Sequence, residues 1–509
     1  MSGASKDGPM GAMETPGVYI VEKSAFPNSA VEVATAIPAF IGYTEKAINA
    51  GKSLKNKPWR ITSLAEYHQY FGSAPISRFK IEKIDPAKED APEIDFILRN
   101  DSYSLTMSSQ RYTFYYSILM FFNNGGGPCY VISVGNYEED IDKSKLEAVI
   151  DELKIEQEPT MLIIPEAVFL KADDCYALQQ ATMKHCGLDM RNRIAILDVY
   201  DGYKSRTDPA GDCINNFRNQ IGIKYLNYSV AYYPWLNTSI VQDRNLSFEN
   251  IDDPKVLAAV IRDEHLIKED DSSPVNDELK KLEESASLEE SEKVILNTTL
   301  VTISPVFNAI ISELKKKLNL LPPAAAMAGI YTMVDNTRGV WKAPANVSVA
   351  SVISPSVNIT HEQQEDLNVI QGKSINAIRL FSGEGTIVWG ARTLDSNSLD
   401  WRYINVRRTM IMLEESIKLA AKAYVFENNT ANTWISVKEM IDNFLLGIWK
   451  RGGLAGTSPG DAFEVHIGLG DTMTPEDILE GIMRITVLVA LIRPAEFIEI
   501  TLQQQMQKS

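Results

Sequence analysis

The chain has 509 residues, of which 45% are hydrophobic and 23% are charged, and its formal net charge is -17. This composition is typical of folded proteins, and the length allows two or three domains with cores of their own. The negative charge disfavours nucleic acid as a general partner, because phosphate binding needs clustered Lys and Arg. The apolar run 485–492 contains Thr486 and is too short to span a bilayer, and no signal peptide is predicted.

The N-terminal region, residues 1–23, is predicted to be an arm. Its first dozen residues are small and polar, and we expect them to be disordered. Pro16-Gly17 then introduces a β-branched and aromatic run that favours a strand, namely Val18, Tyr19, Ile20, Val21 and Glu22. A short tether separates this strand from the rest of the chain, an arrangement that suits an arm more than a core element.

The middle of the chain, residues 24–370, is predicted to be an outer α/β domain. The predicted elements are, in chain order, an extended stretch at 31–43, a helix from Thr62 with Ser63 as N-cap, a helix, glycine loop and strand within 111–134, a strand at 161–165, a helix at 173–186, a strand at 194–199 and a helix at 305–319. Continuous apolar strands separated by helices indicate a sheet covered on both faces, so we expect a mixed α/β fold.

A charged stretch at about 240–295 interrupts this domain. It is poor in apolar residues and shows no stripe that would face a core. We therefore predict an exposed insertion, part helix and part loop.

The last third is predicted to form an inner domain, 371–495, followed by a C-terminal arm strand, 496–509. A helix at 404–424 places Met410, Leu413, Ile417, Ala420 and Tyr424 on one face, with Glu414 and Lys418 as an ion pair. A second helix at 434–449 ends at Lys450 and Arg451, and Thr474 caps a third. Strands are expected at 482–492 and 496–504. The second alternates, with Ile498, Ile500 and Leu502 opposite Glu499, Thr501 and Gln503.

The four cysteines and five histidines predict neither a disulfide nor a metal site. Cys129, Cys175, Cys186 and Cys213 form no Cys-x-x-Cys pair and no metal-binding spacing with histidine. We expect reduced thiols, as in proteins made in the cytosol. The run that begins at His361 lacks the second histidine of a zinc-protease helix.

Two other motifs could carry chemistry, and each also has a structural explanation. The run 123–128, Asn-Asn-Gly-Gly-Gly-Pro, comes after a helix and before a strand and has no following Lys, so a tight turn is favoured over a phosphate loop. The run 232–235, Tyr-Tyr-Pro-Trp, could stack on a sugar, but aromatics beside a proline are more often core. No catalytic residue, metal or cofactor is predicted.

Read in order, several segments of the chain resemble the sheath protein of contractile phage tails and of tail-like injection systems. They are TPGVY (15–19), ITSLAEYHQYFG (61–72), FFNNGGGPCYVISV (121–134), RIAILDV (193–199), AYYPWL (231–236), AGIYTMVDNTRGVWKAPAN (328–346), IRLFSGEGTIVWGARTL (378–394), WRYINVRR (401–408) and RPAEFIEITLQQ (493–504). The similarity covers nearly the whole chain apart from its first residues and the charged stretch.

The resemblance implies a structural role. Sheath subunits stack as hexameric rings around an inner tube in an extended, metastable cylinder. A trigger at the baseplate collapses the cylinder to a shorter and wider lattice, which drives the tube through a target envelope. A cap protein terminates the sheath. Assembly is expected in the bacterial cytoplasm, with release as part of a phage tail or tail-like particle.

The resemblance also implies strand exchange between neighbouring subunits. The donated strands are expected at Val18–Glu22 and at Phe497, Ile498, Glu499, Ile500, Thr501 and Leu502, and the accepting sheet is expected to include Ile485–Leu491. Flexible tethers would let these strands stay paired while the subunits rotate.

A locally basic stretch is the candidate for the tube-facing surface. Residues 390–455 contain nine Lys/Arg and seven Asp/Glu, a local net charge of +2 in an acidic chain. The residues expected to face the tube are Arg407, Arg408, Lys438, Lys450 and Arg451. Alternatively, Lys450 and Arg451 only satisfy the C-terminus of their own helix.

Two other functions remain open at this point. The chain could be an α/β enzyme that binds a nucleotide or sugar at 125–128 and 232–235. It could also be a non-contracting relative, such as a baseplate or sheath-cap component.

Overall fold

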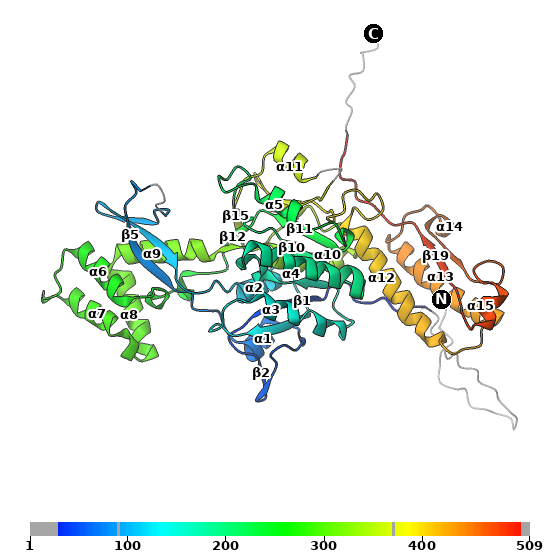
Figure 1. Ribbon diagram of the computed structural model, residues 1–509, viewed down its shortest axis with the longest axis horizontal. Coiled ribbons are helices and arrows are strands. Elements are labelled where there is room, and N and C mark those ends of the chain that lie inside the picture. Colours follow the sequence, from blue (N-terminus) through cyan, green and yellow to red (C-terminus); the bar gives the residue numbers. More distant parts are fainter. Residues whose placement is uncertain (1–28, 89–91, 369–371, 500–509) are drawn as a thin grey trace, which may run out of the picture.

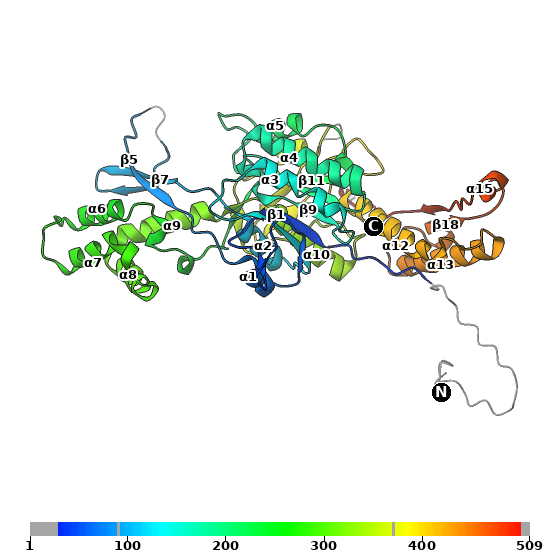
Figure 2. The same ribbon diagram turned by 60° about the horizontal axis from the view of Figure 1, so that its bottom comes forward.

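The computed structural model describes residues 29–88, 92–368 and 372–499. These residues form an elongated molecule with a central α/β body, a helical lobe at one end and a smaller C-terminal unit at the other (Figures 1 and 2). Val18–Glu22 and Ile500, Thr501 and Leu502 lie outside the described residues.

The central body is built on a nine-stranded sheet in the order β14-β17-β16-β11-β10-β9-β1-β8-β4. Six neighbouring strands are parallel, and the three at the ends of the sheet, β14, β17 and β4, run antiparallel to their neighbours. The strands are β1 (Pro38–Tyr43), β4 (Trp59–Ile61), β8 (Cys129–Gly135), β9 (Met161–Ile163), β10 (Ile194–Asp198), β11 (Ser229–Tyr233), β14 (Val347–Ser348), β16 (Asn376–Phe381) and β17 (Gly385–Trp389).

Helices cover both faces of this sheet, as the apolar strands predict. Along β1, Phe40 packs on one face against Phe121, with ring centroids 5.1 Å apart, while Ile41 belongs to the core on the other face. The first face carries α1 (Leu64–Phe71), α2 (Phe114–Asn123) and α10 (Ala324–Arg338), and the second carries α3 (Lys143–Ala148), α4 (Ala172–Lys184), α5 (Cys213–Gln220) and α11 (His361–Leu367). The mixed α/β class is confirmed.

Short strands complete the body. β12 (Leu236–Thr238), β13 (Leu320–Leu321) and β15 (Val352–Pro355) form a small sheet, and β2 (Ile48–Asn49) and β3 (Lys52–Ser53) form a hairpin. The predicted cap of α1 is present, because the Ser63 side chain accepts a hydrogen bond from the Glu66 backbone.

The helical lobe corrects the prediction of a coreless insertion. It contains the sheet β5 (Phe79–Ile84), β6 (Phe96–Leu98) and β7 (Asp101–Met107) and the helices α6 (Pro254–His265), α7 (Pro274–Glu283), α8 (Glu290–Ile303) and α9 (Pro305–Leu318). In α7, Leu279 and Leu282 are fully buried, and Val275 packs beside this core. Val275, Leu279 and Leu282 stand at helical spacing, so the charged stretch does carry a stripe that faces a core.

Three of these helices begin with a polar cap followed by proline. The caps are Asp253, Ser273 and Ser304, and each accepts a hydrogen bond from the first turn of its helix. Within the described ranges, no single helix is long and apolar enough to span a membrane. Helices α8 and α9 together have the length and composition of a membrane span, but the chain bends by 109° between them.

The C-terminal unit packs on α12 (Ile404–Ala421) and α13 (Ala431–Lys450). It also contains α14 (Pro459–Ala462), β18 (Phe463–His466), α15 (Pro475–Leu479) and β19 (Thr486–Val489). Thr474 caps α15 as predicted, by accepting from the backbone of Asp477. The ion pair expected between Glu414 and Lys418 is wrong, since Lys418 instead lies 3.1 Å from Glu415.

The predicted domain boundary at 371 is also wrong. β16 and β17 follow this position but belong to the central sheet, where β16 pairs with β11. The separate C-terminal core begins within α12, at Met412 and Leu413. The boundary therefore falls some forty residues later than the sequence suggested.

Candidate functional site

The sheet of the C-terminal unit has only two strands among the described residues. β18 and β19 pair antiparallel, with Phe463 opposite Val489 and Val465 opposite Val487. These four side chains turn toward the core on α13, whereas Leu488 is 54% exposed. A two-stranded sheet is marginal on its own, and its outer edges offer unpaired backbone groups to an added strand. β19 lies within Ile485–Leu491, the stretch expected to belong to the accepting sheet, and the acceptance of strands from neighbours stays a prediction.

The chain that follows β19 is tied down before it leaves the body. The Asn405 side chain donates to the Ile492 carbonyl at 2.9 Å. The Arg392 guanidinium then holds both carboxylate oxygens of Glu496, at 2.6 Å for the closest pair, and the Tyr403 hydroxyl donates to the same carboxylate. The Arg392 side chain is only 4% exposed, so this bidentate pair is shielded from solvent.

Beyond Glu496 the described chain makes no strand. Residues 496–499 are irregular, and Phe497 and Ile498 are 78% and 80% exposed. Large apolar side chains so exposed at the end of a chain are typical of a segment that packs on a partner. The strand expected at 496–504 therefore has no partner strand within the described part of this chain.

At the other end, residues 29–37 form a strap that runs from the C-terminal unit into β1. Ala30 belongs to the core of the C-terminal unit, and the Val33 backbone donates to the Ser416 side chain at 3.1 Å. Thr35 donates through its hydroxyl to Asp335 at 2.6 Å and accepts through its carbonyl from Arg408 at 2.9 Å. The strap thus fixes the base of the predicted N-terminal arm.

The predicted tube-facing residues separate into two groups. Lys438, Lys450 and Arg451 are exposed on or just after α13, and Arg451 forms an ion pair with Glu32. Arg407 and Arg408 are buried, with 4% of each residue exposed. The prediction is wrong for these two, because both guanidinium groups are turned into the protein.

The two buried arginines are paired inside the chain. Arg408 forms two hydrogen bonds with Asp335, at 2.9 and 2.6 Å, and the Asp335 side chain is 2% exposed. The Arg407 guanidinium lies 4.4 Å from the Tyr228 ring centroid and 4.2 Å from that of Trp401. Burial lowers the pKa of Arg407.

The two motifs considered as enzyme sites, residues 123–128 and 232–235, have structural roles. In the first, the Gly126 backbone donates to the Phe121 carbonyl at 3.0 Å, and a Cβ atom at Gly126 would lie 2.6 Å from that oxygen, so the turn packs against α2. Tyr232, Tyr233 and Trp235 are at most 1% exposed and cannot stack on a sugar. Among the described residues, no three His, Cys, Asp or Glu side chains converge as metal ligands.

Two buried carboxylates have raised pKa values, a property that can mark an active site. Burial raises the pKa of Glu166 to about 8 and that of Asp198 to about 7. Glu166 accepts from the backbone of Thr113 at the start of α2, and Asp198 accepts from Ala324 at the start of α10. Both therefore serve as internal helix caps.

Comparison with known proteins supports the resemblance expected from the sequence. Residues 396–505 match the family model of the phage tail sheath C-terminal domain. The structure is similar over 97% of the chain to the contracted PVC sheath complex of an extracellular contractile injection system, with 26% identity, a TM-score of 0.59 and 99% of that chain covered. The contracted helical sheath of the anti-feeding prophage is similar over 96% of the chain, with 28% identity, a TM-score of 0.59 and 99% coverage.

Curated relatives match over a shorter region. The tail sheath proteins of Vibrio phage KVP40 and Enterobacteria phage T4 are 27% and 28% identical over 36% and 26% of this chain. These matches span only 26% and 20% of the two phage proteins. The chain thus has the fold of contractile sheath subunits, and the resemblance to tail sheath proteins is confirmed.

Proposed function

We propose that this chain is the subunit of a contractile sheath that polymerises as stacked hexameric rings around an inner tube. The observation that carries the proposal is the similarity to two contracted sheaths over nearly the whole chain, with TM-scores of 0.59. The C-terminal unit adds a physical reason for polymerisation. Among the described residues its sheet has two strands and no third strand at either edge, and the tail that leaves it exposes Phe497 and Ile498.

Strand exchange supplies the connection between subunits in this proposal. Residues 18–22 of one subunit and 497–502 of another would add to the sheet β18–β19 of a third. Main-chain hydrogen bonds of this kind hold subunits together while the bodies rotate, because the tethers absorb the motion. The inner tube, the baseplate and a sheath cap are the other partners. Two similar chains belong to anti-feeding prophage baseplate structures, which supports an association with a baseplate.

Electron microscopy of the purified protein tests the proposal. Full-length protein is expected to form hollow helical cylinders, and a variant that lacks residues 1–23 is expected to remain folded but unassembled. Cylinders formed equally well by the truncated protein would refute exchange through this arm. A discrete, non-assembling full-length protein would favour the baseplate or cap alternative.

The tube-facing surface can now be tested more sharply. Lys450 is exposed, whereas Arg451 also holds Glu32, so Lys450→Glu changes surface charge without breaking that pair. We expect this variant to form fewer tube-filled cylinders. Lys316→Glu serves as the control, because Lys316 is exposed on α9, a helix of the helical lobe that lies far from α13 (Figure 1). Equal tube occupancy in the two variants would remove Lys450 from the tube-facing surface.

A further inference from the structure

The bases of both arms are fastened to the same element, helix α12, and to the residues just before it. On the N-terminal side, Arg408 and Ser416 of α12 hold the strap at Thr35 and Val33. On the C-terminal side, Tyr403 and Asn405 hold the tail, together with Arg392 shortly upstream. No other described helix bonds to both the strap and the tail.

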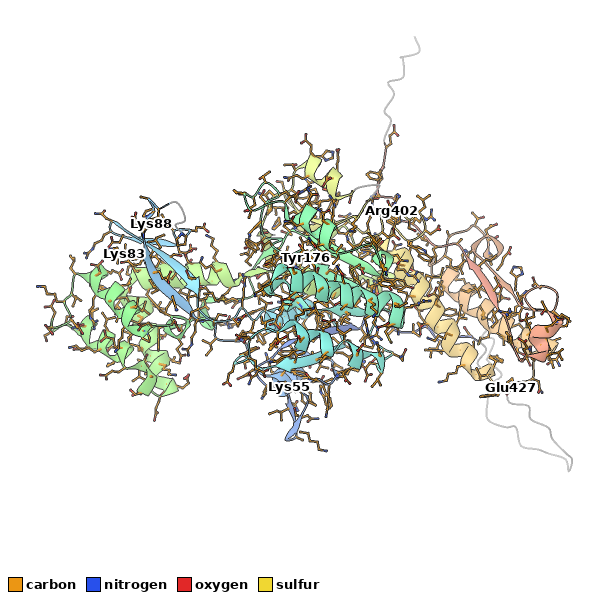
Figure 3. The ribbon with its side chains drawn as sticks, viewed as in Figure 1. Lys55, Lys83, Lys88, Tyr176, Arg402 and Glu427 are labelled. Atoms are coloured by element: carbon orange, nitrogen blue, oxygen red, sulfur yellow. The ribbon has the colours of Figure 1, made fainter. Side chains whose placement is uncertain are left out.

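Helix α12 joins two cores. Ile404 and Ile411 pack in the core of the central body, whereas Met412 and Leu413 pack in that of the C-terminal unit. Figure 3 marks this span, with Arg402 beside the start of the helix, next to the central body, and Glu427 beyond its outer end. At 1.5 Å per residue, an 18-residue helix is a stiff rod about 27 Å long.

The hydrogen bonds that hold the strap through Asp335 cannot lengthen gradually. Arg408 and Asp335 are almost wholly buried and bonded through two hydrogen bonds, and Thr35 adds a third to the same carboxylate. A buried pair of this kind is either formed or broken, because separated charges in the interior are strongly unfavourable. A shift of α12 along its axis therefore changes the strap and the tail together.

We propose that α12 mechanically couples the two arms of one subunit, so that displacement of the N-terminal strap alters how firmly the C-terminal tail is held at Glu496. This inference rests on the proposed strand exchange for its meaning in a lattice. There, a neighbour's pull on one arm reaches the next neighbour through α12 without passing through the helical lobe. Coupling of this kind acts equally in both directions.

A double-variant cycle tests the coupling in the isolated full-length subunit. Thr35→Val removes the hydroxyl that donates to Asp335, and Glu496→Gln removes the charge held by Arg392. The two residues share no hydrogen-bond partner, so without a relay their effects should add. The readout is amide hydrogen exchange at residues 30–37 and at 491–496.

Coupling predicts that Thr35→Val speeds exchange in the tail and that Glu496→Gln speeds exchange in the strap. The exchange rates of the double variant should differ from the product of the two single effects by a factor on the order of 2 to 30, the usual range for coupled sites. Glu139→Gln is the matched control. Glu139 pairs with Lys55 and Lys145 in the central body and should leave both segments unchanged.

Purely local effects with additive behaviour would overturn the proposal. If Glu496→Gln lowers the folded fraction, Tyr403→Phe removes only one hydroxyl from the same carboxylate and must show the same cross-effect. These measurements need no polymer. A protein that never forms cylinders but shows coupling would contradict the sheath function alone, and cylinders without coupling would contradict the relay alone.

Discussion

Replacing Asp335 with asparagine is expected to destabilise the junction between the central body and the C-terminal unit. The Asp335 carboxylate accepts two hydrogen bonds from Arg408 and one from Thr35, and it is 2% exposed. The amide of asparagine keeps the shape but removes the charge. Arg408 is then left buried without a counter-ion.

Loss of one partner from a buried ion pair costs about 3–5 kcal/mol, because the remaining charge is uncompensated. Solvent screening does not reduce this figure here, since the Arg408 side chain is only 4% exposed. With a urea m value of about 2–3 kcal/mol/M, the unfolding midpoint should fall by about 1–2.5 M. Removing both charges with Asp335→Leu and Arg408→Met should restore much of the loss, because the pair itself contributes little net stability.

Urea unfolding followed by tryptophan fluorescence measures these shifts, with the transition of the C-terminal unit analysed separately if the units unfold in steps. Asp243→Asn is the control, because Asp243 forms an exposed pair with Lys315 at 3.0 Å and should cost less than about 1 kcal/mol. A midpoint for Asp335→Asn no lower than that of this control would refute the reasoning. So would a double variant less stable than Asp335→Asn alone.

Three further predictions follow from burial. Burial raises the pKa of Asp198 to about 7, above its value in the unfolded chain, so its contribution to stability is lost as pH rises from about 4 through 7. The urea midpoint of Asp198→Asn should therefore equal that of the wild type at pH 4 and be higher than it at pH 8. Equal midpoints at both pH values would contradict this. Leu282→Ala should lower the opening free energy of the helical lobe, measured by hydrogen exchange, by about 2–5 kcal/mol, because Leu282 is fully buried. Leu266→Ala should lower it by only about 0.5 kcal/mol, because Leu266 is 76% exposed. The four cysteines are buried thiols, so a thiol reagent should label none of them before unfolding, and fast labelling of any one would be inconsistent with that burial.

The central sheet could be predicted from sequence because its strands are apolar on both faces. The runs at 161–165 and 194–199 became β9 and β10, since a strand covered by helices on both sides needs no alternation. The sequence places the strands near 376–389 in the wrong domain. β16 pairs with β11, which lies more than 140 residues earlier, and pairing over that distance leaves no local signal.

The burial of Arg408 was equally invisible in sequence. A charge count treats each arginine as a surface residue, but the partner that allows burial, Asp335, is 73 residues away. The two arm strands stay predictions, based on the β-branched run at 18–22, the alternation at 498–503 and the resemblance. The sequence shows two segments without partners, but not the clamp at Glu496 or the strap at Thr35 that fixes their bases.

The bond between Val33 and Ser416 joins residues 383 positions apart in the chain. During synthesis at about 5–20 residues per second, Val33 waits about 20–80 s before its partner exists. The strap therefore settles only after most of the protein has emerged from the ribosome. Under the proposed strand exchange, a subunit cannot present a correctly based N-terminal arm while it is still being made, so this order of folding would delay polymerisation until the chain is nearly finished.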